Sequence, residues 1–456
     1  MSADGLRACE EKMRAADLPG VAIETFAFYY RQLEAGETGL VAESAIEPVA
    51  SLPDADDLVD EATPALLDQA VVIKLNGGLG TSMGMSGPKS LLVARGEDTF
   101  LDLVARQVLW LRERTSARVP LVLMNSFATR EASLAELHGG LSADLDPDFV
   151  QHKEPKVLAD GMMPAQWPAN PDLEWCPPGH GDLFTALQTS GLLAQMLDRG
   201  YRYAFVSNSD NLAAVLDPRI LAWMAAEEAA FVMEVADRTS ADRKGGHIAR
   251  SADSGALLLR EVAQCPDEDL DAFQDVDRHR YFNTNAVWLD LRALAAELKR
   301  RDGVLGLPLI RNHKTVDPAD KSSPEVFQIE TAMGAALGVI EGARALRVPR
   351  SRFSPVKATT DLLALRSDAY EVAADGSVVL AAARRGRPPF IDLDDEHYKL
   401  VGDFERRFEE PPSLLECEGL VVRGDVTFGR GVVVRGRVEI DASRGAVRLE
   451  DTVLEG

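Results

Sequence analysis

The chain has 456 residues, which is enough for two or three domains with a sizeable hydrophobic core. Hydrophobic residues make up 46% and charged residues 27% of the chain, proportions that are ordinary for a globular protein. The net charge of −24 argues against nucleic acid or an anionic membrane surface as the main partner, so any phosphate site must be a local basic region in an acidic molecule.

The first 68 residues are predicted to be an N-terminal helical segment. Residues 1–16 and 23–33 have the apolar spacing of amphipathic helices, and the acidic stretch at 51–60 is typical of a linker. We identify no catalytic or binding pattern in this segment.

Residues 69–350 are predicted to form a catalytic domain, because apolar β-branched runs alternate with helical patterns. This alternation indicates a mostly parallel sheet with helices on both faces, whose ligands bind beyond the carboxyl ends of the strands. We expect strands at 71–75, 120–124, 203–207, 230–235, 256–262 and 285–290, and helices at 99–114, 181–197 and 291–300.

The strand at 71–75 runs directly into a glycine-rich loop. Glycines stand at positions 77, 78, 80, 84 and 87, and Lys89 follows them. Glycine lets backbone N–H groups approach an anion, and a lysine adds a point charge for phosphate oxygens. The loop fits neither the P-loop fingerprint, because Pro88 precedes Lys89, nor the dinucleotide fingerprint. A glycine-rich connection without a ligand is the alternative interpretation.

The tail of the chain has a different period. Apolar residues recur every six positions, at 420, 426, 432 and 438 and again at 422, 428, 434 and 440, with glycines between them. This period is typical of a parallel β-helix, so residues 351–456 are predicted to be a linker and a hexapeptide-repeat β-helix domain. A few coils have little stability alone, so we expect this domain to dock on the main domain or to join subunits of a homo-oligomer.

The four cysteines are scattered without CxxC spacing, which fits a reducing compartment better than a zinc site or a disulfide framework. The N-terminus lacks the basic start and apolar run of a signal peptide, and no apolar stretch approaches the roughly 20 residues of a membrane-spanning helix. We therefore expect a cytoplasmic protein without a membrane partner.

Further motifs follow the loop sequence LNGGLGTSMG and its GPKS ending in order along the chain. They are FVQHKEPKV (149–157), PPGHGD (177–182), FVSNSDNL (205–212), ADRKGG (241–246), FNTN (282–285), NHKTVDP (312–318), FQIETAMGAA (327–336) and SRFSPVKATTDLL (351–363). Together they resemble the eukaryotic-type UTP–glucose-1-phosphate uridylyltransferases of the UDP-sugar pyrophosphorylase family. The resemblance implies an α/β nucleotidyltransferase fold of the GT-A or Rossmann-like type, with a mixed sheet flanked by helices and a C-terminal left-handed parallel β-helix.

The same resemblance implies an enzyme that joins a sugar 1-phosphate, above all glucose 1-phosphate, to UTP and releases pyrophosphate. The attacking group is already an ionised phosphate, so the reaction needs positioning and cations rather than a general base. Lys89 in GPKS and Lys357 in SPVK match the catalytic lysines of the family, which contact the triphosphate.

Asp210 is the predicted metal ligand. It follows an apolar strand, so its carboxylate emerges at the carboxyl edge of the sheet, where it could hold Mg²⁺ against phosphates. An Asx turn or a helix N-cap is the alternative. The resemblance favours the metal, and a single carboxylate suits Mg²⁺ because that ion keeps several waters and takes other ligands from the substrate.

The resemblance also implies two groups of binding residues. The predicted nucleotide contacts are Leu75, Asn76, Gly77, Gly78, Gln151, Gly179 and His180. The predicted sugar-phosphate contacts are Asn208, Lys244, Gly245, Glu261, Asn283, Asn285 and Lys314. An amide such as Gln151 matches the N3–H and carbonyl edge of uracil, whereas His180 has the alternative role of capping the helix that follows it.

Three positions depart from the family pattern: Ala286 replaces an asparagine, Ala213 a glycine and Ser354 a leucine. The first would remove an amide near the acceptor. These departures leave nucleotidyl transfer intact, but keep another hexose or a cyclitol 1-phosphate, or GTP as the nucleotide, open. A catalytically silent sugar-nucleotide sensor is a further alternative, which the presence of both Lys89 and Asp210 disfavours.

Overall fold

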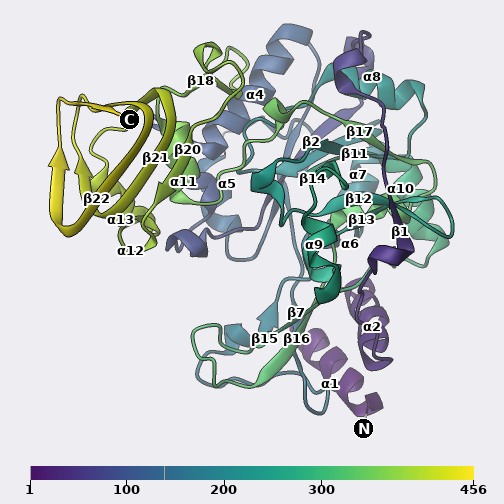
Figure 1. Ribbon diagram of the computed structural model, residues 1–456. Coiled ribbons are helices and arrows are strands. Elements are labelled where there is room, and N and C mark those ends of the chain that lie inside the picture. The colour runs from purple at the N-terminus through teal and green to yellow at the C-terminus, as the bar shows by residue number, and fades with distance from the viewer. Residues whose placement is uncertain (1, 138) are drawn as a thin grey trace.

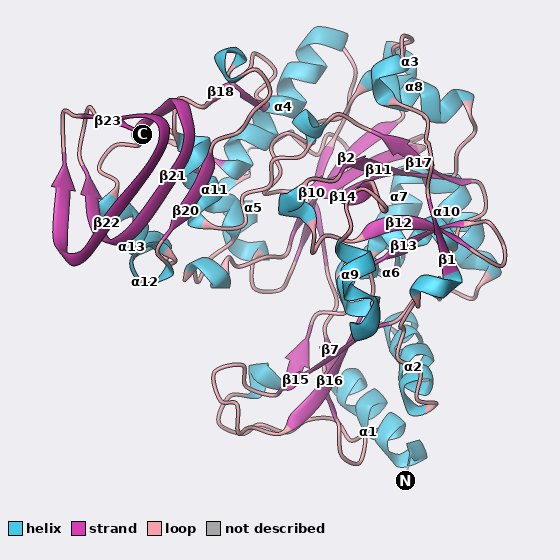
Figure 2. Ribbon diagram, viewed as in Figure 1, coloured by secondary structure: helices cyan, strands magenta, loops and turns pink. Residues whose placement is uncertain are grey.

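The computed structural model describes residues 2–137 and 139–456 and is built around a ten-stranded mixed sheet (Figures 1 and 2). Four neighbouring strands at one side of this sheet are parallel, in the order β10–β2–β5–β6. Their bounds are Tyr203–Asn208 (β10), Ala70–Asn76 (β2), Leu121–Asn125 (β5) and Asp148–Val150 (β6). Since all four run in the same direction, their carboxyl ends meet at one edge of the sheet.

The other side of the sheet is largely antiparallel. The prediction of a mostly parallel sheet is therefore correct only for the side formed by β10, β2, β5 and β6. β14 (Tyr281–Asp290) runs antiparallel to β10, to β11 (Phe231–Asp237) and to β12 (His247–Ser251). The chain enters β14 from the short helix α9 (Leu270–Gln274), and no long crossover helix carries it back to the starting edge as a parallel strand requires. β13 (Leu257–Arg260), β17 (Ala343–Arg347) and β1 (Ile46–Pro48) complete this side.

Helices cover both faces of the sheet, as predicted. The side chains of β2 alternate: Val72 joins the core cluster that contains α4 (Phe100–Thr115), and Val71 and Ile73 join the opposite cluster. That second cluster also contains residues of α6 (Leu183–Thr189), α7 (Leu192–Asp198) and α10 (Leu291–Arg300). The single helix predicted at 181–197 is wrong. Gly191, at φ +79°, divides it into α6 and α7, because a left-handed residue cannot continue an α-helix.

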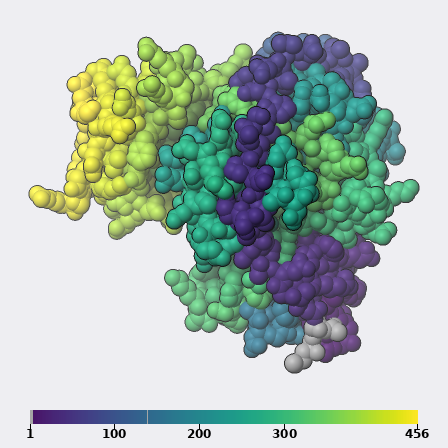
Figure 3. All heavy atoms as spheres, turned by 45° about the vertical axis from the view of Figure 1, so that its right-hand side comes forward, coloured from purple at the N-terminus to yellow at the C-terminus, as the bar shows by residue number. Residues whose placement is uncertain are grey.

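The N-terminal segment contains the two predicted amphipathic helices, α1 (Ser2–Ala15) and α2 (Gly20–Glu34). They pack beside the small sheet of β15 (Ile310–Thr315), β16 (Glu325–Glu330) and β8 (Val157–Leu158), which forms the lower lobe in Figure 1. The chain then crosses the surface as an extended strap, purple in Figure 3, and β1 adds to the central sheet beside β12.

The C-terminal region forms a separate sheet of four parallel strands. They are β20 (Phe390–Leu393), β21 (Ser413–Phe428), β22 (Val433–Leu449) and β23 (Val453–Glu455). Apolar residues of the six-residue repeat, among them Leu420, Val426 and Phe428, are fully buried and belong to the same core cluster as α4. Among the described residues, no helix has both the length and the apolar character needed to cross a bilayer.

Candidate active site

The predicted site residues gather at the carboxyl edge of the parallel strands. The glycine loop follows β2, Gln151 follows β6 directly, and Asp210 lies two residues beyond β10. Asn208 pairs in register with Leu75 on the neighbouring strand. Residues that are far apart in the sequence therefore lie near one another, at the edge that the sequence analysis interprets as the ligand-binding edge.

Lys89 and Asp210 form an ion pair at the centre of this edge. Lys89 Nζ lies 2.8 Å from Asp210 Oδ2, and the two side chains are only 15% and 19% exposed. The backbone N–H of Lys89 donates to the carbonyl of Gly78, which folds the lysine back over the glycine loop. Asp210 Oδ1 is buried and has no hydrogen-bond partner among the described residues. One oxygen of this carboxylate is thus uncommitted in the described part of the chain.

The residues predicted to read the base lie together. Gln151 Nε2 donates to the carbonyl oxygen of Gly179 at 2.9 Å, so its free atom is the acceptor Oε1, on the side of Gly77. Gly179 has φ +77°, and a Cβ at this position would lie 2.4 Å from the carbonyl oxygen of Thr331. Only glycine allows this loop to approach so closely.

His180 does not cap α6. Its Nδ1 accepts the backbone N–H of Met333 at 3.0 Å, which leaves Nε2 as a hydrogen-bond donor. Burial lowers the pKa of His180 to about 4, so the ring is neutral at physiological pH. The Asn76 side chain is buried elsewhere, because its amide donates to Asn125 Oδ1 and Ser133 Oγ. These bonds turn the Asn76 amide toward the sheet and α5 (Arg130–Glu136).

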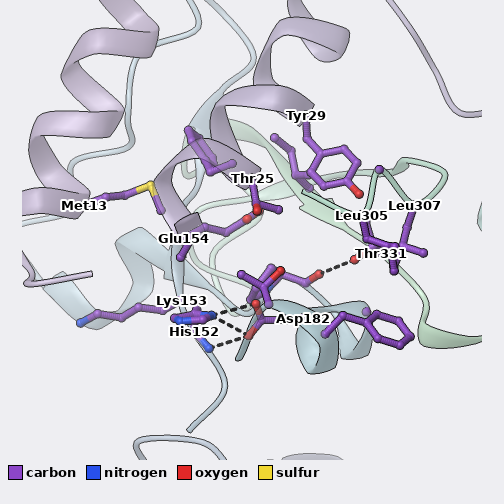
Figure 4. A pocket seen from close by; sticks show the side chains of 18 residues that line it. Met13, Thr25, Tyr29, His152, Lys153, Glu154, Asp182, Leu305, Leu307 and Thr331 are labelled. Carbon is purple, nitrogen blue, oxygen red and sulfur yellow. Dashed lines mark hydrogen bonds and ion pairs between the residues drawn. The ribbon is translucent and has the colours of Figure 1, made fainter. Parts of the chain in front are cut away.

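Sequence reasoning missed a buried pair, His152 with Asp182 (Figure 4), which adjoins the residues predicted to read the base. The backbone N–H of His152 donates to Asp182 Oδ2 at 2.7 Å, and His152 Nδ1 lies 2.9 Å from Asp182 Oδ1. The pair links the strand end that carries Gln151 to the loop that carries Gly179. His152 and Asp182 line a cavity together with Glu154. Burial raises the pKa of Glu154 well above its usual value. Both His152 and Asp182 lie in motifs of the sequence analysis, but no local sequence pattern indicates that they pair.

Three predicted sugar-phosphate contacts, Asn283, Asn285 and Glu261, form a second group at this edge. Asn283 Nδ2 donates to Asn285 Oδ1 at 2.8 Å, and the backbone N–H of Asn285 donates to Asn283 Oδ1 at 2.9 Å. Asn285 has φ +57° in a β-bulge of β14, a feature that redirects side chains. Burial raises the pKa of Glu261, whereas a hydrogen bond from Asn283 and the charge of Lys357 oppose that rise. Lys357 therefore connects this group to the rest of the site.

The departure at Ala286 has a different meaning from the one predicted. Ala286 is 1% exposed and lies in the core cluster with Trp288 and Phe282. The prediction that its asparagine-to-alanine change removes an amide from the acceptor site is wrong, because strand alternation points residue 286 to the same face as Phe282 and Trp288, into the core. Ala213 is buried too, and the backbone N–H of Ser354 donates to Asn211 Oδ1.

Two predicted lysine contacts stand apart from the centre of the site. Lys314 lies on β15 of the small sheet, exposed, and donates to Gln328 Oε1 at 3.3 Å. Lys244 is exposed on the turn before β12, beside the half-buried Gly245. A Cβ at Gly246, the residue that follows, would lie 2.3 Å from Glu261 Oε2, so a larger residue there would displace the Glu261 carboxylate.

Glycine backbone, lysines, a carboxylate and an amide acceptor thus lie at one strand edge, and groups of these kinds bind phosphates, cations and bases. Comparison with known sequences identifies the family. A profile of the family described as UTP–glucose-1-phosphate uridylyltransferase matches residues 23–435, and the chain belongs to this family of enzymes.

Individual relatives are similar over most of their length. The barley (Hordeum vulgare) UTP–glucose-1-phosphate uridylyltransferase is 40% identical over 424 residues, which cover 92% of this chain and 86% of the relative. The Saccharomyces cerevisiae enzyme is 39% identical over 401 residues, covering 86% and 79%. A solved UDP-glucose pyrophosphorylase from Leishmania major, a variant in complex with UDP-glucose, is 44% identical with a TM-score of 0.92, and 99% of each chain is covered.

Proposed function

We propose that this protein joins UTP and glucose 1-phosphate to give UDP-glucose and pyrophosphate. The observation that carries the proposal is the convergence of Lys89, Asp210, Gln151 and Gly179 at one strand edge, in a chain that matches a UDP-glucose-bound relative along its whole length. In the reaction, an oxygen of the sugar phosphate attacks the α-phosphorus of UTP, and the bond from that phosphorus to the bridging oxygen of the β-phosphate breaks.

The residues of this chain supply binding, orientation and positive charge for that step. The glycine loop presents backbone N–H groups, Lys89 lies at the centre of the site, and Lys357 lies toward the sugar group near Glu261. These cations offset the repulsion between the two phosphate substrates, a role that needs no general base. Glu261, Asn208, Asn283 and Asn285 provide hydrogen-bonding groups for sugar hydroxyls, and Lys244, Gly245 and Lys314 are proposed to reach the phosphates once substrates are bound.

Mg²⁺ fits the donor set at Asp210. No cluster of three or more His, Cys, Asp or Glu residues suited to a metal occurs in the described part of the chain, so a fully protein-bound ion is not supported. The buried, partnerless Asp210 Oδ1 is the single hard oxygen donor that Mg²⁺ needs when water and substrate phosphates complete its shell. When bound, the ion would neutralise phosphate charge, and Asp210 is the residue that would hold it.

The C-terminal sheet is inferred to be a left-handed parallel β-helix. Its strands are parallel, its apolar repeat has a six-residue period, and Gly424, Gly431 and Gly436 have positive φ at bends of the chain. Since titratable groups of the proposed reaction all lie before residue 365, this region is proposed to serve stability and, through its open end, contact with a second copy.

Deleting residues 412–456 should lower the thermal midpoint by at least about 5 °C while the remaining folded protein still transfers uridylyl groups. The deletion removes the carbonyl of Val426, which accepts from the buried Tyr398 hydroxyl at 2.7 Å, and uncovers Phe404 and Phe408. Differential scanning calorimetry and an assay of pyrophosphate release check both parts. An unchanged midpoint, or a folded truncation with no activity, would contradict the proposed role.

UTP should be preferred over ATP and GTP by about 10⁴-fold in kcat/KM. We expect Gln151 Oε1 to accept the N3–H of uracil, a donor that adenine lacks, and we expect the glycine loop around residues 75–78 to deny room to the larger purines. CTP should also be rejected, because the N3 of cytosine is itself an acceptor. Comparing the four triphosphates with glucose 1-phosphate checks this prediction, and Gln151→Leu should reduce the discrimination. If GTP were the best substrate, only the nucleotidyltransferase assignment would remain.

The experiment that tests the whole proposal is pyrophosphate release from UTP with a panel of sugar and cyclitol 1-phosphates. Glucose 1-phosphate should give the highest kcat/KM. Faster turnover of another hexose or a cyclitol 1-phosphate would redirect the acceptor assignment. Binding of UDP-glucose without turnover of any acceptor would instead support a silent sensor.

A further inference from the structure

Two buried basic side chains, Lys74 and Arg352, hold the loop that carries Asp210. Lys74 Nζ donates to Ser207 Oγ at 2.7 Å and to the carbonyl of Ala214 at 2.8 Å. Arg352 Nη2 donates to the carbonyl of Val215 at 2.9 Å, and the same guanidinium binds both carboxylate oxygens of Glu234, at 2.9 and 2.7 Å. Lys74, Arg352 and Glu234 are all at least 90% buried. The loop therefore has a fixed path between β10 and α8 (Pro218–Ala226).

Asn211 is the next residue after Asp210. Its side-chain amide makes two hydrogen bonds to the backbone of residues 352–354. Its Nδ2 donates to the carbonyl of Arg352 at 3.1 Å, and its Oδ1 accepts the N–H of Ser354 at 3.0 Å. The N–H of Val356 donates to the carbonyl of Asp210 itself at 3.1 Å. These three hydrogen bonds, which we call the Asn211 bridge, join two segments about 140 residues apart, and Asn211 is only 2% exposed.

We propose that Asn211 is a positioning residue, which fixes the backbone before Lys357 against the Asp210 loop and so sets the spacing between the Lys357 ammonium and the Asp210 carboxylate. Lys357 follows Val356 directly, so its Cα moves with the bridge. This inference rests on the proposed function, in which both groups act on the same phosphates. A displacement of about 1 Å in such a site can cost about 100-fold in rate.

The chemistry of the bridge requires an amide. A carboxylate in its place would accept from Ser354 but repel the carbonyl of Arg352, and an aliphatic side chain would leave both backbone groups buried without partners. An ordinary buried amide would serve stability alone. Asn211 differs because a residue of the proposed machinery is attached directly to each side of the bridge.

The test is a double-mutant cycle between Asn211→Leu and Lys357→Ala, measured as kcat with UTP, Mg²⁺ and glucose 1-phosphate. Asn211→Leu should lower kcat by 10- to 100-fold, with KM for both substrates changed less than about 3-fold. In the Lys357→Ala background the same substitution should lower kcat by less than about 3-fold, because the group that it positions is gone. Asn211→Ser, too short to reach both partners, repeats the cycle in case the leucine variant does not fold.

Gln107→Leu is the matched control. Gln107 is 7% exposed and donates to the carbonyl of Leu212 in the same loop, but it makes no bond to the 352–356 segment. This variant should lose thermal stability comparably and keep kcat within about 3-fold of the wild type. An equal loss of kcat from Asn211→Leu in both backgrounds, or an unchanged kcat, would overturn the proposal.

Hydrogen–deuterium exchange tests whether the Asn211 bridge forms, and it does not depend on enzymatic turnover. The amides of Ser354 and Val356 should exchange at least about 10-fold faster in Asn211→Leu than in the wild type, and at the wild-type rate in Gln107→Leu. An unchanged exchange rate in Asn211→Leu would reject the bridge. A wild-type protein that exchanges as expected but transfers no uridylyl group would reject the proposed function instead, and with it the catalytic purpose of the bridge.

Discussion

Replacing Asp210 by alanine or asparagine should lower kcat for UDP-glucose formation by at least about 100-fold, because the change removes the carboxylate that is proposed to hold Mg²⁺. The fold should be retained. Among the described residues, Lys89 is the only side chain that is hydrogen-bonded to this carboxylate, and Oδ1 has no partner. We expect the thermal midpoint to stay within about 2 °C of the wild type.

The measurement is initial-rate kinetics over a Mg²⁺ titration, with calorimetry on the same samples. Asp253→Ala, at an exposed turn, is the matched control and should behave as the wild type. Near-normal Mg²⁺-dependent rates in Asp210→Asn would show that the carboxylate is an Asx-turn residue and that the metal assignment is wrong.

Replacing Lys89 by alanine or methionine should lower kcat by about 100-fold or more and change the Kd of UDP-glucose by less than about 5-fold. Its charge is expected to matter most as negative charge builds on the phosphates in the transition state. Lys321→Ala, which removes an exposed lysine, should leave both quantities unchanged. A higher Kd with an unchanged kcat would mean that Lys89 binds substrate without assisting transfer.

The 2.8 Å ion pair adds a second consequence to the Lys89 substitution. If Asp210 holds a cation as proposed, Lys89 competes with that cation for the carboxylate in the substrate-free protein, so Lys89→Met should bind Mn²⁺ more tightly than the wild type when no nucleotide is present. Electron paramagnetic resonance of free Mn²⁺ measures this affinity. Weaker Mn²⁺ binding in Lys89→Met would contradict the competition.

Much of the fold and of the site was predictable because its signals are local. The apolar run of β2 ends in glycines and that of β10 ends in Asp210, and parallel strands bring such ends to one edge. The six-residue repeat likewise predicted parallel strands in the tail, since period alone distinguishes them from helices and hairpins. Local spacing thus predicted which edge of the sheet carries the site residues, and the resemblance to a known family supplied the chemistry expected there.

Only the tertiary structure decided which of these residues meet and which do not. The Lys89–Asp210 pair, the His152–Asp182 pair and the Asn211 bridge join segments that no periodicity relates. The β-bulge in which Asn285 takes a φ of +57° likewise depends on pairing with the partner strand β11. The sequence by itself determined which backbone conformations are favourable residue by residue. Contacts between distant segments depend on strand direction, register and packing, which are set by the free energy of the whole fold.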